Sequence, residues 1–226
     1  GADTYSAWAV REASGISEGD KLLTFSKIRA ASQIMANLPY VKGVRIGIKL
    51  PDTVNIMIEE ESVVYAIKSS DGQWWMMDSD GRVVEQANNA KAATATQLLG
   101  VTLEAPAVNQ KGIATEMTPS ETNELGELIP VTTTGAQRLT AALQILKALE
   151  NNDIVGEAAS VDVTSTEDII LWYGTRYQVN LGDTSRLDYK IDCMNDAILQ
   201  MSDYQSGVLD ISFTIWPNQV GYTPFA

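Results

Sequence analysis

The N-terminal part of the chain changes from a helical to a strand pattern of hydrophobic positions. A short helix is predicted over residues 6–14, because Ser6 suits a helix start and Gly15 suits a left-handed C-terminal residue. A second helix is predicted over residues 26–38, and Pro39 ends it. Its apolar positions, spaced three and four apart, are Ile28, Ala31, Met35 and Leu38.

Apolar and polar side chains then alternate along residues 44–48 and 54–58. A turn over residues 50–53 separates the two runs, so they predict an antiparallel hairpin with one face on a core and one face in water. We expect the apolar stripe of the 26–38 helix to cover the inner face. The first unit is therefore a helix–helix–hairpin module.

The rest of the chain shows short apolar runs between turn residues, which is typical of an antiparallel sheet. Strands are predicted at 63–67, 74–77, 83–84, 101–103, 158–163, 168–173, 177–181 and 207–216. Apolar positions three and four apart predict helices over about 137–151 and 186–203. The fold class is α+β: a helix–helix–hairpin domain over 1–62, then a mostly antiparallel β domain over 63–226 that carries two helices.

Composition narrows the possible functions. The chain has 16 Lys and Arg against 29 Asp and Glu, a net charge of −13, so it repels phosphate backbones and we expect no nucleic-acid partner. It has no His, the commonest general base and metal ligand, and one Cys, Cys193, which excludes an internal disulfide. We expect no cofactor, no metal and no catalytic residue set.

Two carboxylate groupings are the candidates for chemistry. Glu59, Glu60 and Glu61 are consecutive at a strand end, where neighbouring side chains point to opposite faces. Three aspartates four residues apart on the 186–203 helix have oxygen ligands that suit Ca²⁺, but their spacing is better explained by the solvent-exposed face of an amphipathic helix: Asp188, Asp192 and Asp196. We interpret both groupings as solvated surface.

Several short sequence motifs occur along the chain. They are Ala13-Ser14-Gly15-Ile16, Gly19-Asp20-Lys21-Leu22-Leu23, Leu38-Pro39-Tyr40-Val41, Pro51-Asp52-Thr53-Val54-Asn55-Ile56, Arg176-Tyr177-Gln178-Val179-Asn180-Leu181-Gly182 and Gly207-Val208-Leu209-Asp210-Ile211. By their order and spacing, the chain resembles the extracytoplasmic part of the bacterial FtsQ/DivIB cell-division family over nearly its whole length. The resemblance implies a POTRA domain over 1–62, with the first strand of that domain apparently missing, and the family's β domain over 63–226.

The resemblance also implies a function. It predicts a non-enzymatic scaffold of the division septum that binds FtsB/DivIC-type and FtsL-type coiled-coil proteins and helps to regulate septal wall synthesis. It places the protein at the outer face of the cell membrane, and we expect the parent protein to be anchored by a segment absent from this sequence. Two alternatives stay open: an extracellular cell-wall hydrolase with a carboxylate pair that includes Glu60 or Asp192, and a POTRA-type chaperone module.

Aromatic residues concentrate near the C-terminus, where the resemblance predicts partner binding. The candidate contact residues are Phe213, Ile215, Trp216, Tyr222 and Phe225. Aromatic side chains are enriched at binding hot spots. Because only a proline-containing tail follows the predicted 207–216 strand, we expect the outer edge of that strand to be unpaired and to accept a partner strand.

Overall fold

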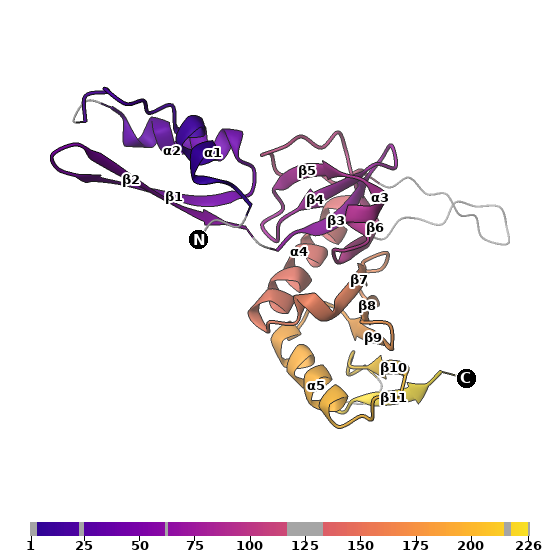
Figure 1. Ribbon diagram of the computed structural model, residues 1–226. Coiled ribbons are helices and arrows are strands. Elements are labelled where there is room, and N and C mark those ends of the chain that lie inside the picture. Colours follow the sequence, from indigo (N-terminus) through magenta and orange to yellow (C-terminus); the bar gives the residue numbers. More distant parts are fainter. Residues whose placement is uncertain (1–3, 23–24, 62, 117–132, 215–217, 226) are drawn as a thin grey trace. The chain divides into compact units, whose positions relative to one another are not determined.

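The computed structural model describes residues 4–22, 25–61, 63–116, 133–214 and 218–225 (Figure 1). The chain divides into two compact units, Gly1–Val63 and Val64–Ala226, called here the N-terminal and C-terminal units. Among the described residues, no helix is both long and apolar enough to cross a membrane.

The N-terminal unit begins with two capped helices. Helix α1 (Ala7–Ser14) starts where the Ser6 hydroxyl accepts the Ala9 N–H, and it ends at Gly15, whose φ of 65° is left-handed. Helix α2 (Lys27–Asn37) starts in the same way at Ser26. The predicted helices are thus present, each within a residue of its expected bounds.

Strands β1 (Val41–Lys49) and β2 (Thr53–Glu60) form the antiparallel hairpin. Helices α1 and α2 cover one face of it (Figure 1). The buried core residues of this unit are Val10, Ile34, Leu38 and Val41, with Val44, Ile56 and Ile58 packed against them.

The predicted apolar stripe of α2 is wrong at two of its positions. Ile28 is 82% exposed and Met35 is 40% exposed, whereas Ala30 and Ile34 are buried. The helix is rotated so that the row through Ala30 and Ile34 faces the hairpin. Ile28 therefore remains a large apolar side chain on the surface.

The C-terminal unit contains one sheet of nine strands within its described part, in the order β11-β10-β9-β8-β7-β6-β3-β4-β5. Its strands are β3 (Tyr65–Ser69), β4 (Trp74–Met77), β5 (Val83–Ala87), β6 (Gln97–Leu103), β7 (Ala158–Asp162), β8 (Ile169–Tyr173), β9 (Tyr177–Gly182), β10 (Gly207–Asp210) and β11 (Gly221–Pro224). The pairs β10–β9, β7–β6 and β6–β3 are parallel and the other five are antiparallel. The α+β class with a mostly antiparallel sheet is confirmed.

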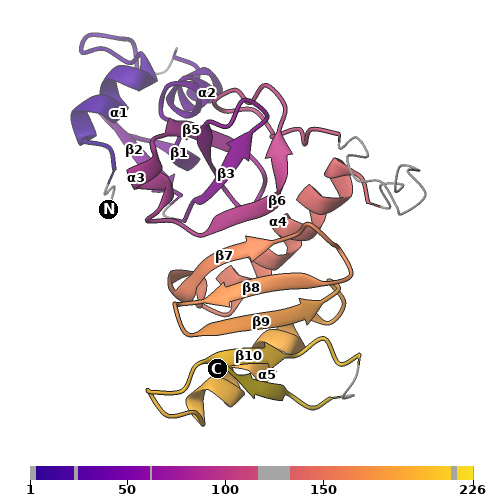
Figure 2. The same ribbon diagram turned by 90° about the vertical axis from the view of Figure 1, so that its right-hand side faces the viewer.

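Two long helices pack on one face of this sheet (Figure 2). Helix α4 (Gly135–Asn151) begins with a capping box between Thr134 and Gln137, and helix α5 (Leu187–Leu199) follows β9. The remaining helical segments are short: α3 (Asn89–Ala92) and the 3-10 turn Val155–Glu157. In strands β7 to β10, alternate residues are buried beneath α4 and α5, and the residues between them lie on the opposite face, which no described helix covers at these strands. At β3 and β4 that opposite face packs against α3, where Ala66, Met76 and Ala92 are buried.

The end of the chain differs from the sequence prediction. The predicted 207–216 strand stops as β10 at Asp210, and the chain then turns back to add β11 antiparallel to β10. The outer edge of β10 is therefore paired, contrary to the prediction, and β11 is the terminal strand on that side of the sheet.

Candidate partner-binding surface

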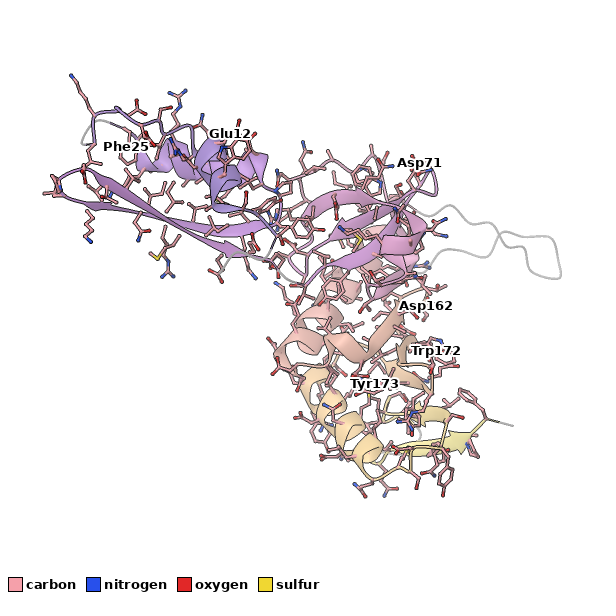
Figure 3. All side chains as sticks on the ribbon, viewed as in Figure 1. Glu12, Phe25, Asp71, Asp162, Trp172 and Tyr173 are labelled. Atoms are coloured by element: carbon pink, nitrogen blue, oxygen red, sulfur yellow. The ribbon has the colours of Figure 1, made fainter. Side chains whose placement is uncertain are left out.

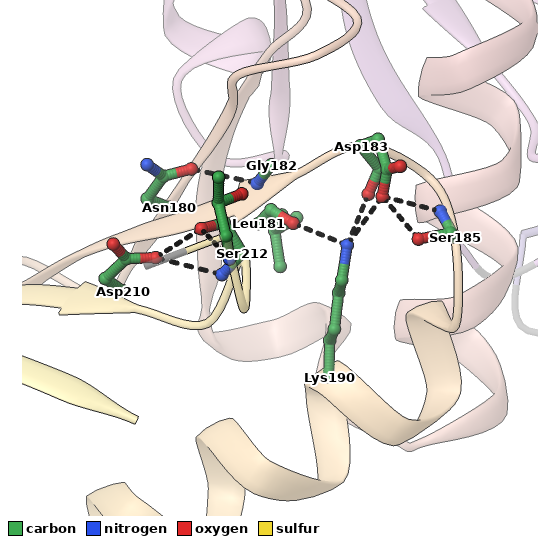
Figure 4. A network of polar contacts seen from close by, with 9 residues as sticks. Asn180, Leu181, Gly182, Asp183, Ser185, Lys190, Asp210 and Ser212 are labelled. Carbon is green, nitrogen blue, oxygen red and sulfur yellow. Dashed lines mark hydrogen bonds and ion pairs between the residues drawn. The ribbon is translucent and has the colours of Figure 1, made fainter. Parts of the chain in front are cut away.

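A parallel crossover, β9–α5–β10, supports the C-terminal edge of the sheet, and a buried lysine holds it together (Figure 4). Lys190 is 1% exposed. Its Nζ donates to the carbonyl oxygens of Leu181 and Asp183 and to Asp183 Oδ1, each at 2.8 Å. The hydrogen bonds from Lys190 and Ser185 lower the pKa of Asp183 to about 2. Helix α5 is thereby fixed to the end of β9.

Side chains next to this network shape the exit from β10. Asp210 Oδ1 accepts hydrogen bonds from the backbone N–H and the hydroxyl of Ser212 at 2.9 and 2.7 Å. Asn180 Oδ1 accepts the N–H of Gly182 in the same way at 2.8 Å (Figure 4). These local bonds replace strand pairing after Asp210, which is why the alternating pattern beyond it does not continue as a strand.

Phe213 belongs to the loop after β10 and packs on α5. Its φ is 58°, a left-handed value incompatible with a continuing strand. Its ring lies 5.6 Å from that of Tyr189, and the Arg186 guanidinium lies 4.3 Å from the Tyr189 ring. Arg186 also donates to Asn218 Oδ1 at 3.1 Å. Phe213 therefore attaches the returning chain to the helix.

Gly207 permits the close approach of β11 to β10. A Cβ at this position would clash with the Thr223 carbonyl oxygen and would lie 2.8 Å from Cε2 of Tyr222. The Tyr222 ring thus occupies the space that a side chain would fill, and its hydroxyl donates to the Ser206 carbonyl at 3.1 Å. Glycine is required here for packing rather than for a left-handed φ.

The backbone direction of β11 follows from one hydrogen bond. Phe225 N–H donates to Ser206 O at 3.1 Å, so the backbone of Phe225 faces β10. Because successive residues alternate, Tyr222 and Pro224 direct their backbone groups to the outer side. Pro224 has no N–H, so this edge offers one donor, from Tyr222, and two carbonyl acceptors.

Aromatic side chains continue from this edge onto the uncovered face of the sheet. Phe225 is 42% exposed and stacks on Trp172 of β8, with ring centroids 6.1 Å apart at 25°. Trp172 is labelled in Figure 3. The cross-strand row that contains Trp172 also contains Gln178, Val208 and Thr223. Two stacked aromatic rings, beside Val208 and two polar side chains, thus adjoin the uncovered edge.

The predicted contact residues are distributed over this region rather than gathered at one point. Phe213 contacts α5, Tyr222 lies on β11, and Phe225 lies on the uncovered face. Ile215 and Trp216 fall outside the described residues. Sequence reasoning missed Trp172, although the run of five apolar residues 169–173 contained the signal, since a strand apolar at every position has two apolar faces.

The carboxylates considered for chemistry have structural partners or lie in solvent. Glu60 accepts the backbone N–H groups of Thr4 and Tyr5 at 2.8 and 2.9 Å, and Glu61, 8% exposed, pairs with Lys42 at 3.0 Å. Asp192 is exposed on α5. Within the described ranges, no group of three or more Asp, Glu or Cys side chains is placed to hold a metal ion.

Comparison with known proteins first defines the class of the N-terminal unit. Residues 1–61 match the family model of the POTRA domain, FtsQ-type, in agreement with the two helices and the hairpin. The described residues before α1 form no strand. The chain thus carries an FtsQ-type POTRA domain.

A relative then extends the comparison beyond the domain. Over 92 residues the chain is 30% identical to the cell division protein DivIB of Clostridium acetobutylicum. The match covers 41% of this chain and 36% of that protein, so it spans about a third of the relative's length. Together the two matches agree with the resemblance: the chain carries an FtsQ-type POTRA domain, and over 92 residues it is similar to a DivIB cell division protein.

Proposed function

We propose that this protein is a non-enzymatic scaffold of the division septum that binds an FtsB/DivIC-type coiled-coil partner through β11. The partner segment adds as a strand to the outer edge of β11, and its side chains pack on Phe225 and Trp172. The protein also binds an FtsL-type coiled-coil protein, and the assembly helps to regulate septal wall synthesis. The protein acts at the outer face of the cell membrane.

The uncovered edge of β11 is the observation that carries this proposal. Edge strands supply main-chain hydrogen bonds to an added strand, and neighbouring aromatic side chains supply specificity. β11 has four residues and one outward N–H, so it disfavours indiscriminate pairing and suits a partner that also uses the aromatic surface. The DivIB relative and the FtsQ-type domain support the septal setting.

Two substitutions at Tyr222 separate the ring from the backbone donor. Tyr222→Ala removes the ring together with its hydroxyl bond to Ser206, and Tyr222→Pro removes these and the outward N–H without removing a backbone hydrogen bond to β10. Isothermal titration calorimetry measures the affinity for the outer segment of a DivIC-type protein. We expect this affinity to fall by about thirtyfold in Tyr222→Ala. It should fall by a further factor of about five in the second, as one hydrogen bond contributes about 1 kcal/mol. Unchanged affinity in both variants would refute the proposal.

The hydrolase alternative is tested with the same protein. Glu60→Gln and Asp192→Asn should leave partner affinity unchanged, and neither variant nor the unmodified chain should release fragments from cell-wall glycan. Release by the unmodified chain that either substitution abolishes would favour the enzyme.

A further inference from the structure

The charge of the chain is unevenly divided between its two units. Residues 1–63 hold 7 Lys and Arg against 8 Asp and Glu, whereas residues 64–226 hold 9 against 21. Most basic side chains of the C-terminal unit are engaged; Lys190 and Arg186 are examples. The N-terminal unit keeps exposed cations for which the described part of the chain shows no ion pair, among them Lys27, Arg29 and Lys49.

These cations gather at one end of the N-terminal unit. Phe25, two residues before α2, and Asp52, in the hairpin turn, line the same cleft of about 330 Å³. The start of α2 and the turn between β1 and β2 are therefore neighbours, as Figure 1 shows, and Phe25 is labelled at this end in Figure 3. Lys27 and Arg29 come from the start of α2, and Lys49 comes from the end of β1.

Two of the most exposed aliphatic side chains lie among these cations. Ile28, between Lys27 and Arg29, is 82% exposed, and Leu50, next to Lys49, is 71% exposed. We name Lys27, Ile28, Arg29, Lys49 and Leu50 the tip surface. Aliphatic side chains surrounded by Lys and Arg are the composition of elements that lie in the headgroup region of a membrane.

The acidic residues at this end are held by the fold. Glu18 pairs with Arg11 at 3.0 Å, Asp20 accepts the Ser17 N–H at 2.9 Å, and Asp52 accepts the Thr53 hydroxyl at 3.0 Å. The three cations of the tip surface exceed the two carboxylates, Asp20 and Asp52, for which the described residues show no ion pair. The local charge is thus positive in a chain whose net charge is −13.

We propose that the tip surface binds an anionic lipid surface, with Ile28 and Leu50 entering the headgroup region and the three cations contacting lipid phosphates. Charge complementarity selects this occupant, because an anionic leaflet attracts the tip while it repels the C-terminal unit. This site is separate from the partner-binding edge and does not depend on it.

The test uses the whole chain and sedimentation with vesicles of phosphatidylcholine, with or without phosphatidylglycerol. We expect binding to the anionic vesicles that weakens with added salt. The vesicle partition coefficient of the triple variant Lys27→Gln/Arg29→Gln/Lys49→Gln should fall by about a hundredfold, because the loss of each cation lowers it by about fivefold. Ile28→Ser/Leu50→Ser should lose about tenfold or more through the buried apolar area.

A matched control comes from the C-terminal unit, where Lys111 is exposed and Ile113 is 67% exposed. Lys111→Gln/Ile113→Ser should bind vesicles like the unmodified chain. The tip variants should keep their circular dichroism and their affinity for the DivIC-type segment, which separates this proposal from the proposed function. No binding to anionic vesicles, equal binding to neutral vesicles, or binding unaffected by the triple variant would overturn it.

Discussion

The two edges of the nine-stranded sheet are finished in different ways. At the start of β5 the chain covers its own edge: Asn109 N–H donates to Val83 O, and Val83 N–H donates to Gln110 O, both at 2.8 Å. Beyond β11 no described segment pairs with the sheet. A sheet edge left unpaired is a liability unless it is short or blocked, so the contrast indicates that the β11 edge is kept for a partner.

The local chemistry of the edges explains the contrast. The segment that covers β5 depends on Asn109, whose φ of 65° lets the chain bend back onto the strand. The β11 edge instead depends on Gly207, which admits the strand, and on Pro224, which limits its outward donors. The β5 edge is closed at Val83 by backbone pairing, whereas the β11 edge is restricted but open.

The largest effect is expected where the closed edge is broken. Proline in Asn109→Pro fixes φ near −65° and removes the N–H that bonds Val83, so the unfolding free energy should fall by about 3 kcal/mol in urea denaturation. The uncovered β5 edge should also produce concentration-dependent self-association in light scattering. Asn109→Gly, which keeps both the N–H and access to positive φ, should remain monomeric. A monomeric proline variant of unchanged stability would contradict this account of the edge.

At the open edge, Gly207→Ala should displace β11 and lower affinity for the DivIC-type segment by about thirtyfold, or about 2 kcal/mol. The new Cβ clashes with the Thr223 carbonyl, so the strand must shift. Gly156→Ala is the matched control, because nothing lies within 4 Å of the Cβ it would add. Binding that survives in the first variant and falls in the control would reverse the assignment.

The aromatic surface beside the open edge should show a smaller effect. The stacked rings of Trp172 and Phe225 should couple by about 1 kcal/mol in a double-mutant cycle of alanine variants, measured as the unfolding free energy. Such coupling would show that the end of the chain is held on the uncovered face in solution. Additive effects of the two substitutions would show that the stack does not stabilise the fold.

Much of the fold could be predicted because the apolar residues of its elements recur with a regular period, and turn residues separate one element from the next. The α4 and α5 helices repeat their apolar positions every three or four residues, and the β1–β2 hairpin alternates around a proline turn. The stripe of α2 was misjudged because Ile28 and Met35 are large and apolar, while the buried positions include the small Ala30. The larger apolar side chains therefore indicated the wrong face of α2 as the buried one.

The candidate surface was harder to predict because its decisive features depend on tertiary contacts. Gly221–Pro224 has no strand period and contains proline, so β11 appeared as a tail. Phe213 continued the alternation of β10 but lies in a left-handed turn. Lys190, a charged residue on α5, is buried because it satisfies two carbonyl groups and a carboxylate at the end of β9, a fact that periodicity cannot reveal.

The smallest effect concerns the ion pair that supports the open edge. The pKa of Asp183 is lowered to about 2 from an unfolded value near 3.8, so the carboxylate stabilises the fold above pH 4 and loses this contribution as the pH falls toward 2. Because this side chain is 58% exposed, solvent screening limits the contribution to about 1 kcal/mol. The unfolding free energy of Asp183→Asn should therefore lie about 1 kcal/mol below that of the unmodified chain at pH 6, and the difference should shrink near pH 2.5.

Asp192→Asn, on the exposed face of α5, should show a much smaller change over the same range. A difference for Asp183→Asn that grows as the pH falls would mean that the pair with Lys190 does not stabilise the folded state, and that β9 and α5 are joined by the carbonyl hydrogen bonds alone.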